Sequence, residues 1–178
     1  MKATGIVRRI DELGRIVVPK EIRRTLRIRE GDPLEVYTDR EGEIILKKYS
    51  PVGELANFAL QYAKVLAETT GKLVCITDMD HVIAAQGSGK RHLENQPISR
   101  ELEKLIEQRK DYSSLETGDV VPVAKEMKES FKGQSVSVVN VHGDALGAVI
   151  LLGQEEISPM EITLVHTTAE FLGSIMED

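Results

Sequence analysis

The chain has 178 residues, of which 41% are hydrophobic and 29% are charged, values typical of a soluble globular protein of one or two domains. No apolar run approaches the roughly 18 residues that a membrane span needs, and the first ten residues lack the apolar core of a signal peptide. We therefore expect a cytoplasmic protein without a membrane partner.

The net charge of −6 is distributed unevenly along the chain. Residues 1–50 carry a net charge of +3, and residues 51–178 carry −9. The sequence Ser-Pro-Val-Gly at positions 50–53 supplies a Pro/Gly break where the charge changes sign. We therefore predict two domains, residues 1–51 and residues 52–178, with different partners.

The first domain is predicted to begin with two short strands, Gly5–Ile10 and Arg15–Val18, because both runs are rich in β-branched residues. Pro19 suits the first turn of a helix in which Ile22 and Leu26 share the apolar face. Two further strands, LEVYT and EIILKK, complete the domain. Because fifty residues with so few large apolar groups bury little surface, we expect an intimate dimer.

The second domain begins with an amphipathic helix between positions 55 and 66, followed by a hairpin of KLVCIT and HVIAAQ. A helix capped by Ser99 comes next, and the strands QSVSVVNV and LGAVILLG then pair. Ser-Pro-Met-Glu at positions 158–161 combines a capping box with proline at the first helical position, and so predicts the last helix. This order predicts an α+β domain with an antiparallel sheet.

The first and last helices of this domain carry apolar residues away from their main apolar stripes. These residues are Leu60 and Val65 on the first helix and Leu164 and Phe171 on the last. Two interpretations remain open. Both helices pack in a bundle with a second chain, or both simply cover their own sheet.

The obvious catalytic and metal-binding patterns are absent from the sequence. Residues 87–92, GSGKRH, lack the first glycine and the Ser or Thr of a phosphate-binding P-loop. The four histidines are scattered, and the single cysteine, Cys75, lies in an apolar strand-like run. We therefore predict no catalytic residue, no metal ligand and no cofactor, and a protein that is not an enzyme.

Positive charge is concentrated in the segment DELGRIVVPKEIRRTLRI, where five basic residues fall within thirteen positions: Arg15, Lys20, Arg23, Arg24 and Arg27. Arginine matches phosphate and guanine geometry through its planar guanidinium. The predicted strand–turn–strand–helix frame holds these groups in place, and twofold symmetry would double the patch. We therefore predict binding to double-stranded DNA, with an acidic protein or peptide as the alternative partner.

The segment TGIVRRIDELGRIVVPKEIRRTLRIREGDPLEVY resembles the AbrB family of bacterial transition-state regulators. The resemblance implies a swapped-hairpin dimer, in which hairpins from two chains interleave into one β-core that binds DNA. It also implies that Arg8, Arg15, Arg23 and Arg24 contact DNA. We add two basic neighbours as DNA-binding candidates: Arg9 and Lys20.

An AbrB-like domain followed by a sensor-like domain resembles regulators of sporulation genes in the forespore, both activators and repressors. The second domain is then similar to GAF domains, which implies a regulatory and oligomerising module and an unidentified small-molecule effector. Two dimerising modules imply a homotetramer, and DNA binding implies association with the nucleoid. Two alternatives stay open: an antitoxin-like DNA-binding protein, and a DNA-tethered enzyme whose catalytic site lies in the second domain.

Arg27 departs from the AbrB pattern, which commonly has glycine at this position. Glycine there ends the helix in the left-handed region, where arginine costs about 1 kcal/mol. Either the helix ends differently in this chain, or the charge of Arg27 compensates by reaching a phosphate.

Overall fold

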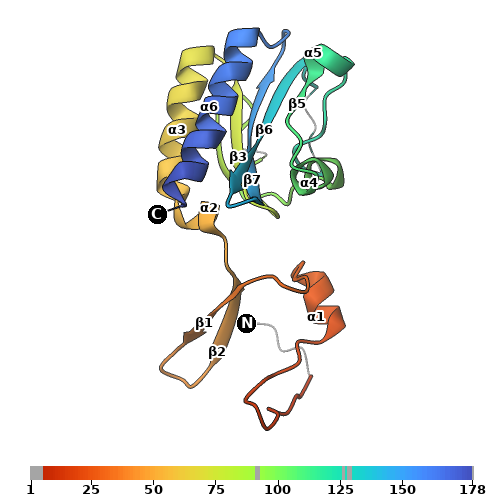
Figure 1. Cartoon of the computed structure of the whole chain (residues 1–178), viewed down its shortest axis with the longest axis vertical. Helices are drawn as coiled ribbons and strands as arrows, with labels where there is room; N and C mark the ends of the chain where they lie inside the picture. Colours follow the sequence, from red (N-terminus) through yellow and green to blue (C-terminus); the bar gives the residue numbers. More distant parts are fainter. Residues whose placement is uncertain (1–5, 91–92, 126, 128–129, 178) are drawn as a thin grey trace. The chain divides into compact units, whose positions relative to one another are not determined.

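The computed structural model describes residues 6–90, 93–125, 127 and 130–177, and its elements are shown in Figure 1. Three residues discussed above, Gly5, Arg91 and His92, lie outside this part. The chain forms two compact units, Met1–Tyr49 and Ser50–Asp178. None of the helices in the described ranges is long and apolar enough to cross a membrane.

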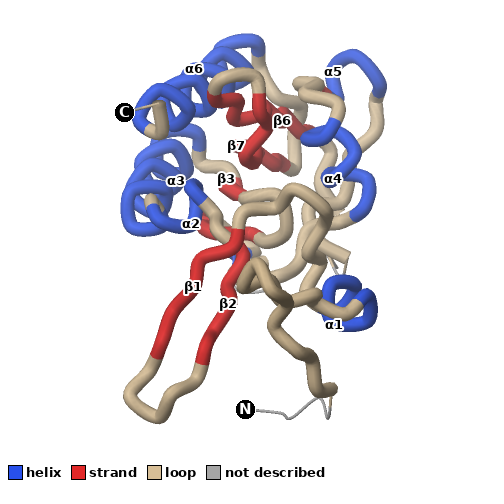
Figure 2. The backbone as a smooth tube through the Cα atoms, turned by 60° about the horizontal axis from the view of Figure 1, so that its bottom comes forward, coloured by secondary structure: helices blue, strands red, loops and turns tan. Residues whose placement is uncertain are grey.

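The N-terminal unit contains one short helix and one β-hairpin. Helix α1, Lys20–Thr25, follows Pro19 as predicted. Strands β1, Leu34–Thr38, and β2, Ile44–Lys48, pair antiparallel and form the two-stranded ribbon seen in Figure 2. The turn between them is closed by the carboxylate of Asp39, which accepts the N–H of Glu43 at 2.9 Å.

The prediction of strands at Gly5–Ile10 and Arg15–Val18 is wrong for the described residues. The backbone from residue 6 to residue 18 forms a turn but belongs to no strand. Its turn bonds run from the N–H of Asp11 to the carbonyl of Arg15 and from the N–H of Gly14 to the carbonyl of Asp11, both at 3.0 Å. A β-branched run favours extended backbone, but a strand also needs a neighbouring strand to complete its ladder. Within the described part of this single chain, no such neighbour lies beside the segment.

The C-terminal unit is an antiparallel sheet of five strands in the order β4-β3-β7-β6-β5, flanked by helices. The two longest strands, β6 and β7, pair along their whole length. The elements in chain order are α2 Pro51–Glu54, α3 Ala56–Thr70, β3 Leu73–Thr77, β4 Val82–Gln86, α4 Arg100–Glu107, β5 Tyr112–Ser113, α5 Ser114–Thr117, β6 Gly133–Val141, β7 Asp144–Gly153 and α6 Pro159–Ile175.

Both faces of this sheet are buried, and strand β3 shows how its side chains divide between two cores. Val74 and Ile76 point into a core formed with α3 and α6, whereas Leu73 and Cys75 point into a core formed with α4. Successive residues of a strand face opposite sides, so a strand covered on both sides is buried throughout, as all five residues of β3 are. In Figure 1, α3 and α6 lie together on one side of the sheet and α4 lies on the other. The result is the predicted α+β fold.

The predicted helix starts are confirmed at two positions. The Ser99 hydroxyl accepts the N–H of Leu102 at 3.0 Å at the start of α4. At the start of α6, Ser158 and Glu161 form a reciprocal capping box, with Pro159 in the first turn. The first helix differs from expectation because Ser50 caps a separate short helix, α2, before α3 begins. The short elements β5 and α5 are also additions to the predicted order.

Glu161 connects the first turn of α6 to the start of β3. One carboxylate oxygen pairs with the ammonium of Lys72, and the other accepts the N–H of Ser158 at 2.7 Å. Both side chains are largely buried, with exposed fractions of 17% for Lys72 and 14% for Glu161. Burial raises the pKa of Glu161, but the hydrogen bonds from Lys72 and Ser158 outweigh this effect and hold the pKa below its ordinary value. The ionised carboxylate is therefore favoured by folding.

We expect Glu161→Gln to lower the free energy of unfolding by about 2 kcal/mol at pH 7, because the buried Lys72 ammonium loses its partner. The contribution of a carboxyl whose pKa is lowered by folding is present above its unfolded pKa of about 4.3 and is lost as the pH falls through the folded value. The difference between variant and parent should therefore shrink under acidic conditions. Urea unfolding of both proteins at a series of pH values measures this difference in the free energy of unfolding.

Glu170→Gln is the matched control, because Glu170 is an exposed residue of the same helix. It should change the free energy of unfolding by less than about 0.5 kcal/mol. A Glu161→Gln penalty that stays constant from pH 7 to acid conditions would contradict the ion-pair account.

Candidate nucleic-acid interface

The turn before α1 is organised by Asp11, which fixes the position of Arg15. The carboxylate of Asp11 accepts the backbone N–H of Arg15 at 2.8 Å and that of Leu13 at 3.0 Å. It also accepts the guanidinium Nε–H of Arg15 at 2.8 Å. These bonds, led by the backbone N–H of Arg15, lower the pKa of Asp11. Gly14 takes the left-handed conformation, with φ 76°, that closes the turn.

The Arg15 side chain remains 70% exposed although its Nε–H is bound to Asp11. One edge of the guanidinium is therefore held, and most of the group still faces solvent. Asp11 was not predicted as a site residue. Its signal in the sequence is the pair Asp11 and Arg15, four positions apart and on either side of a glycine turn.

Helix α1 carries three of the predicted DNA-binding residues. Pro19 stands at its N-cap, and the N–H of Arg23 donates to the Pro19 carbonyl at 2.9 Å. Arg23 and Arg24 lie three and four positions after Lys20, so both side chains are neighbours of Lys20 on the helix surface. Lys20 and Arg24 are exposed, and Arg23 is half-buried.

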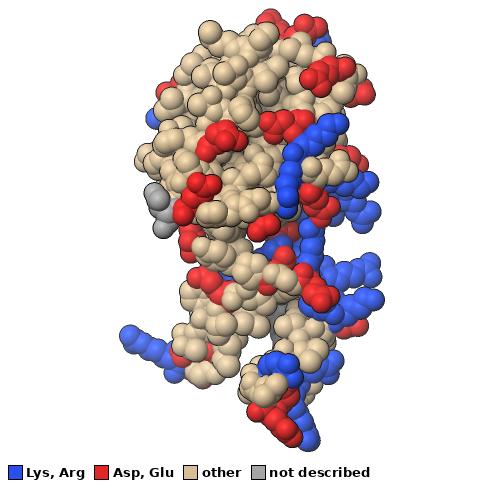
Figure 3. Space-filling view, in the orientation of Figure 1, with Lys and Arg blue, Asp and Glu red and all other residues tan. Residues whose placement is uncertain are grey.

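Two further candidates, Arg8 and Arg9, lie in the irregular segment before the turn and are exposed. Arg8 donates to the carbonyl of Val7 at 3.2 Å. Figure 3 shows Lys and Arg side chains standing out from the N-terminal unit, with Asp and Glu side chains among them. The six candidates thus share one unit, but only those on α1 and in the Asp11 turn are held by local structure.

The predicted anchoring of α1 by Ile22 and Leu26 is only partly found. Ile22 is half-buried, whereas Leu26 is 56% exposed. A short helix needs a packed apolar face for most of its stability. In the single chain, Ile22 therefore packs as expected, whereas Leu26 does not help to anchor α1.

Arg27 adopts the left-handed conformation, with φ 54°, so the helix does end where the family pattern has glycine. The N–H of Ile28 donates to the carbonyl of Arg23 at 2.8 Å, which is the long bond of a Schellman cap. The carbonyl of Arg27 in turn accepts from Lys48 at 3.4 Å, and Lys48 pairs with Asp32 at 3.1 Å. The alternative that the helix ends differently is therefore wrong.

We expect Arg27→Gly to raise the free energy of unfolding by about 0.5–1 kcal/mol, because glycine removes the left-handed strain at a helix end. Arg29→Gly removes the same charge from a residue with ordinary φ, and should destabilise the protein. Chemical denaturation of both variants gives the comparison. A lower free energy of unfolding in both variants would contradict the proposed strain at Arg27.

The described residues include one group of three acidic side chains close enough to hold a metal ion: Asp39, Glu41 and Glu43. It lies at the β1–β2 turn, and Asp39 there accepts the N–H groups of Glu41 and Glu43. Closing the turn accounts for this arrangement, since acidic residues commonly bond the backbone in turns.

Helices α3 and α6 present apolar side chains away from their own core. Leu60 is 41% exposed, Val65 is 62% exposed and Phe171 is 39% exposed. Leu164 is half-buried and packs against the core instead. Phe171 also stacks with Tyr62, with ring centroids 5.1 Å apart. Both helices therefore cover their own sheet and still leave an apolar outer surface.

The family model for the stage V sporulation protein T C-terminal domain, described as a transcription factor, matches residues 54–177. A second model, for the bacterial antitoxin MazE, matches residues 7–54. Stage V sporulation protein T of Bacillus subtilis is 48% identical over 180 residues, which cover 99% of both chains. The transition state regulatory protein AbrB of the same organism is 67% identical over 51 residues, covering 29% of this chain and 52% of AbrB.

Two solved structures are each similar to part of the chain. The N-terminal DNA recognition domain of Bacillus subtilis AbrB is 65% identical and covers 29% of this chain and 94% of that chain, with a TM-score of 0.26. The GAF domain of PixJ from Thermosynechococcus elongatus is 13% identical and covers 73% of this chain and 89% of that chain, with a TM-score of 0.52. The second likeness concerns the fold alone.

The match to AbrB agrees with the predicted AbrB-type N-terminal domain. The likeness to PixJ agrees with the predicted GAF-like fold of the C-terminal domain. The match to stage V sporulation protein T confirms a transcription factor rather than an enzyme. Residues 54–177 match a domain described as a transcription factor, and this match favours a transcription factor over the antitoxin alternative. The chain belongs to the stage V sporulation protein T family.

Proposed function

We propose that this chain regulates sporulation genes in the forespore, as activator and repressor, by binding double-stranded DNA with loose sequence preference. The observation that carries the proposal is the frame of basic residues in the N-terminal unit. Helix α1 presents Lys20, Arg23 and Arg24, and Asp11 holds Arg15. Arg8 and Arg9 extend the surface. Guanidinium groups held in this way match phosphates and guanine edges.

In this proposal, residues 1–51 form an intertwined dimer. Within the described part of the N-terminal unit, Pro19 is the single buried residue. Large apolar side chains are exposed instead, among them Val7, Leu13, Val17, Val36 and Ile44. A unit of this size cannot be stable with its apolar side chains in water, and pairing with a second copy buries them.

Residues 52–178 form the regulatory domain, and they join two such dimers into a tetramer. The exposed apolar side chains of α3 and α6, Leu60, Val65 and Phe171, support this assignment because burial against a second chain would remove them from water. The same domain senses a small molecule whose binding modulates DNA occupancy. The protein thereby acts at the nucleoid.

Fluorescence anisotropy of a labelled duplex titrated with the full chain tests the DNA-binding role. We expect saturable binding that weakens steeply with salt, and competition by unrelated duplex DNA. An acidic peptide that binds more tightly than DNA at physiological salt would overturn the proposal in favour of a protein partner.

A further inference from the structure

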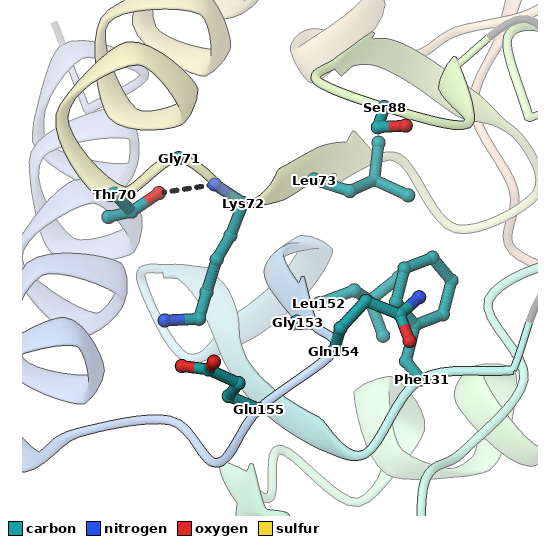
Figure 4. Close-up of a pocket in the computed structure, with 10 residues that line it drawn as sticks. All are labelled: Thr70, Gly71, Lys72, Leu73, Ser88, Phe131, Leu152, Gly153, Gln154 and Glu155. Atoms are coloured by element: carbon teal, nitrogen blue, oxygen red, sulfur yellow. Dashed lines mark hydrogen bonds between the residues drawn. The ribbon is translucent and has the colours of Figure 1, made fainter.

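The C-terminal unit contains a cavity of about 360 Å³ at the end of its sheet where α3 passes into β3. Figure 4 shows the residues that line it. Its apolar part is formed by the half-buried Phe131 over the almost fully buried Leu73 and Leu152, and its polar part includes Lys72 and Glu155. The volume lies at the lower end of the range for small-molecule sites. The cavity therefore suits a ligand of modest size with one apolar end.

Two glycines keep this cavity in shape through close backbone approach. A Cβ on Gly87 would lie 2.7 Å from the carbonyl oxygen of Lys72, so only glycine lets the loop carrying Ser88 approach β3. A Cβ on Gly153 would lie 2.6 Å from Cε of Lys72, so glycine leaves room for the lysine stem. The Lys72 ammonium itself is held by its ion pair with Glu161.

The charged groups of the cavity are of opposite sign and lie at the same end. In Figure 4, the ammonium of Lys72 and the carboxylate of Glu155 point toward one another, away from Leu73 and Phe131. Lys72 uses one donor for Glu161 and carries three in all, so donors remain for a ligand carboxylate. Glu155 is exposed and offers acceptors for a ligand ammonium. The carboxylate of Glu155 would repel a purely anionic ligand, and the ammonium of Lys72 would repel a purely cationic one.

From this arrangement we propose that the cavity binds a small zwitterion with an apolar side chain, such as an α-amino acid. Its carboxylate contacts Lys72, its ammonium contacts Glu155, and its side chain lies against Phe131, the accessible apolar side chain of the lining. This inference rests on the sensory role proposed above, and gives that role a site and a ligand class.

The site also has a physical connection to the surface proposed for tetramer formation. Lys72 pairs with Glu161, and Glu161 accepts the N–H and hydroxyl of Ser158 at 2.7 and 2.8 Å. A ligand that shares the Lys72 ammonium therefore acts on the first turn of α6. That helix carries Phe171 on its outer surface. Occupancy is linked in this way to the helix pair.

The test is a thermal-unfolding screen of the full chain with the twenty common L-amino acids at concentrations up to about 10 mM. We expect an apolar amino acid at ten times its dissociation constant to raise the midpoint by about 3 °C. Its N-acetyl and amide derivatives, which each lack one charge, should bind at least about tenfold more weakly. Equal affinity of the three forms, or no shift with any amino acid, would overturn the inference.

Variants locate the site. Glu155→Gln should raise the dissociation constant of the amino acid about fivefold. Glu156→Gln removes the same charge from an exposed neighbour outside the cavity lining, and should leave the constant unchanged. Equal effects of both variants would place the ligand elsewhere. Because DNA binding is measured independently, failure of the amino-acid screen with intact DNA binding contradicts this inference alone.

Discussion

Arg24→Ala should weaken DNA binding by the full chain about thirtyfold while leaving the oligomer intact. Arg24 is exposed on α1, so its truncation removes no core contact. A specific arginine contact is worth about 1–3 kcal/mol, and the proposed homodimer would lose two copies at once. If the lost contacts are to phosphates, the slope of log K against log salt should also become shallower by about 2. Fluorescence anisotropy at several salt concentrations measures both effects.

Arg40→Ala is the matched control for this experiment. Arg40 is an exposed arginine of the same unit, in the turn between β1 and β2, and is not among the predicted DNA contacts. It changes the net charge by the same amount, so it should alter affinity only slightly. If Arg40→Ala and Arg24→Ala weaken binding equally, the effect is one of net charge, and α1 is not the contact surface.

The second large effect is expected at the outer surface of α3. Val65→Glu should convert the proposed tetramer into dimers, because Val65 is 62% exposed in the single chain and glutamate there would place an unpaired carboxylate in the proposed interface. Burying such a charge costs about 3 kcal/mol or more, which raises the dissociation constant at least about a hundredfold. Sedimentation equilibrium of the full chain measures the change in oligomeric state.

Lys104→Glu serves as the control on α4, which packs on the opposite face of the sheet. Its side chain is exposed, so the tetramer should persist. Two observations would contradict the proposed interface: a parent protein that is already dimeric at high concentration, or a Val65→Glu variant that remains tetrameric.

The sequence predicted most helices and strands of the C-terminal domain, because capping residues and apolar runs within each element mark them. Ser99 and Ser158 cap helices where the sequence places them, and the continuous apolar run of β3 fits a strand that is buried on both faces. The connection between Lys72 and Glu161 could not be predicted, because the partners are 89 positions apart and are brought together only by the sheet. The cavity beside them depends on the same long-range packing.

In the N-terminal unit, a strand was predicted where the structure has none. The strand pattern of residues 15–18 is clear in the sequence, yet the backbone there is irregular in the single chain. A ladder needs a second strand, and in the proposed dimer another copy of the chain would supply it. Arg27 shows the opposite case, because the glycine of related sequences correctly predicts its left-handed backbone although arginine disfavours it.

The central claim is that the basic residues of the N-terminal unit neutralise DNA phosphates from both chains of a dimer. The most direct measurement is the dependence of the full chain's affinity for a duplex on salt concentration. If eight phosphates are neutralised, log K should fall against log salt with a slope of about −7. A slope near zero would contradict the claim, because no set of arginine–phosphate contacts is insensitive to salt.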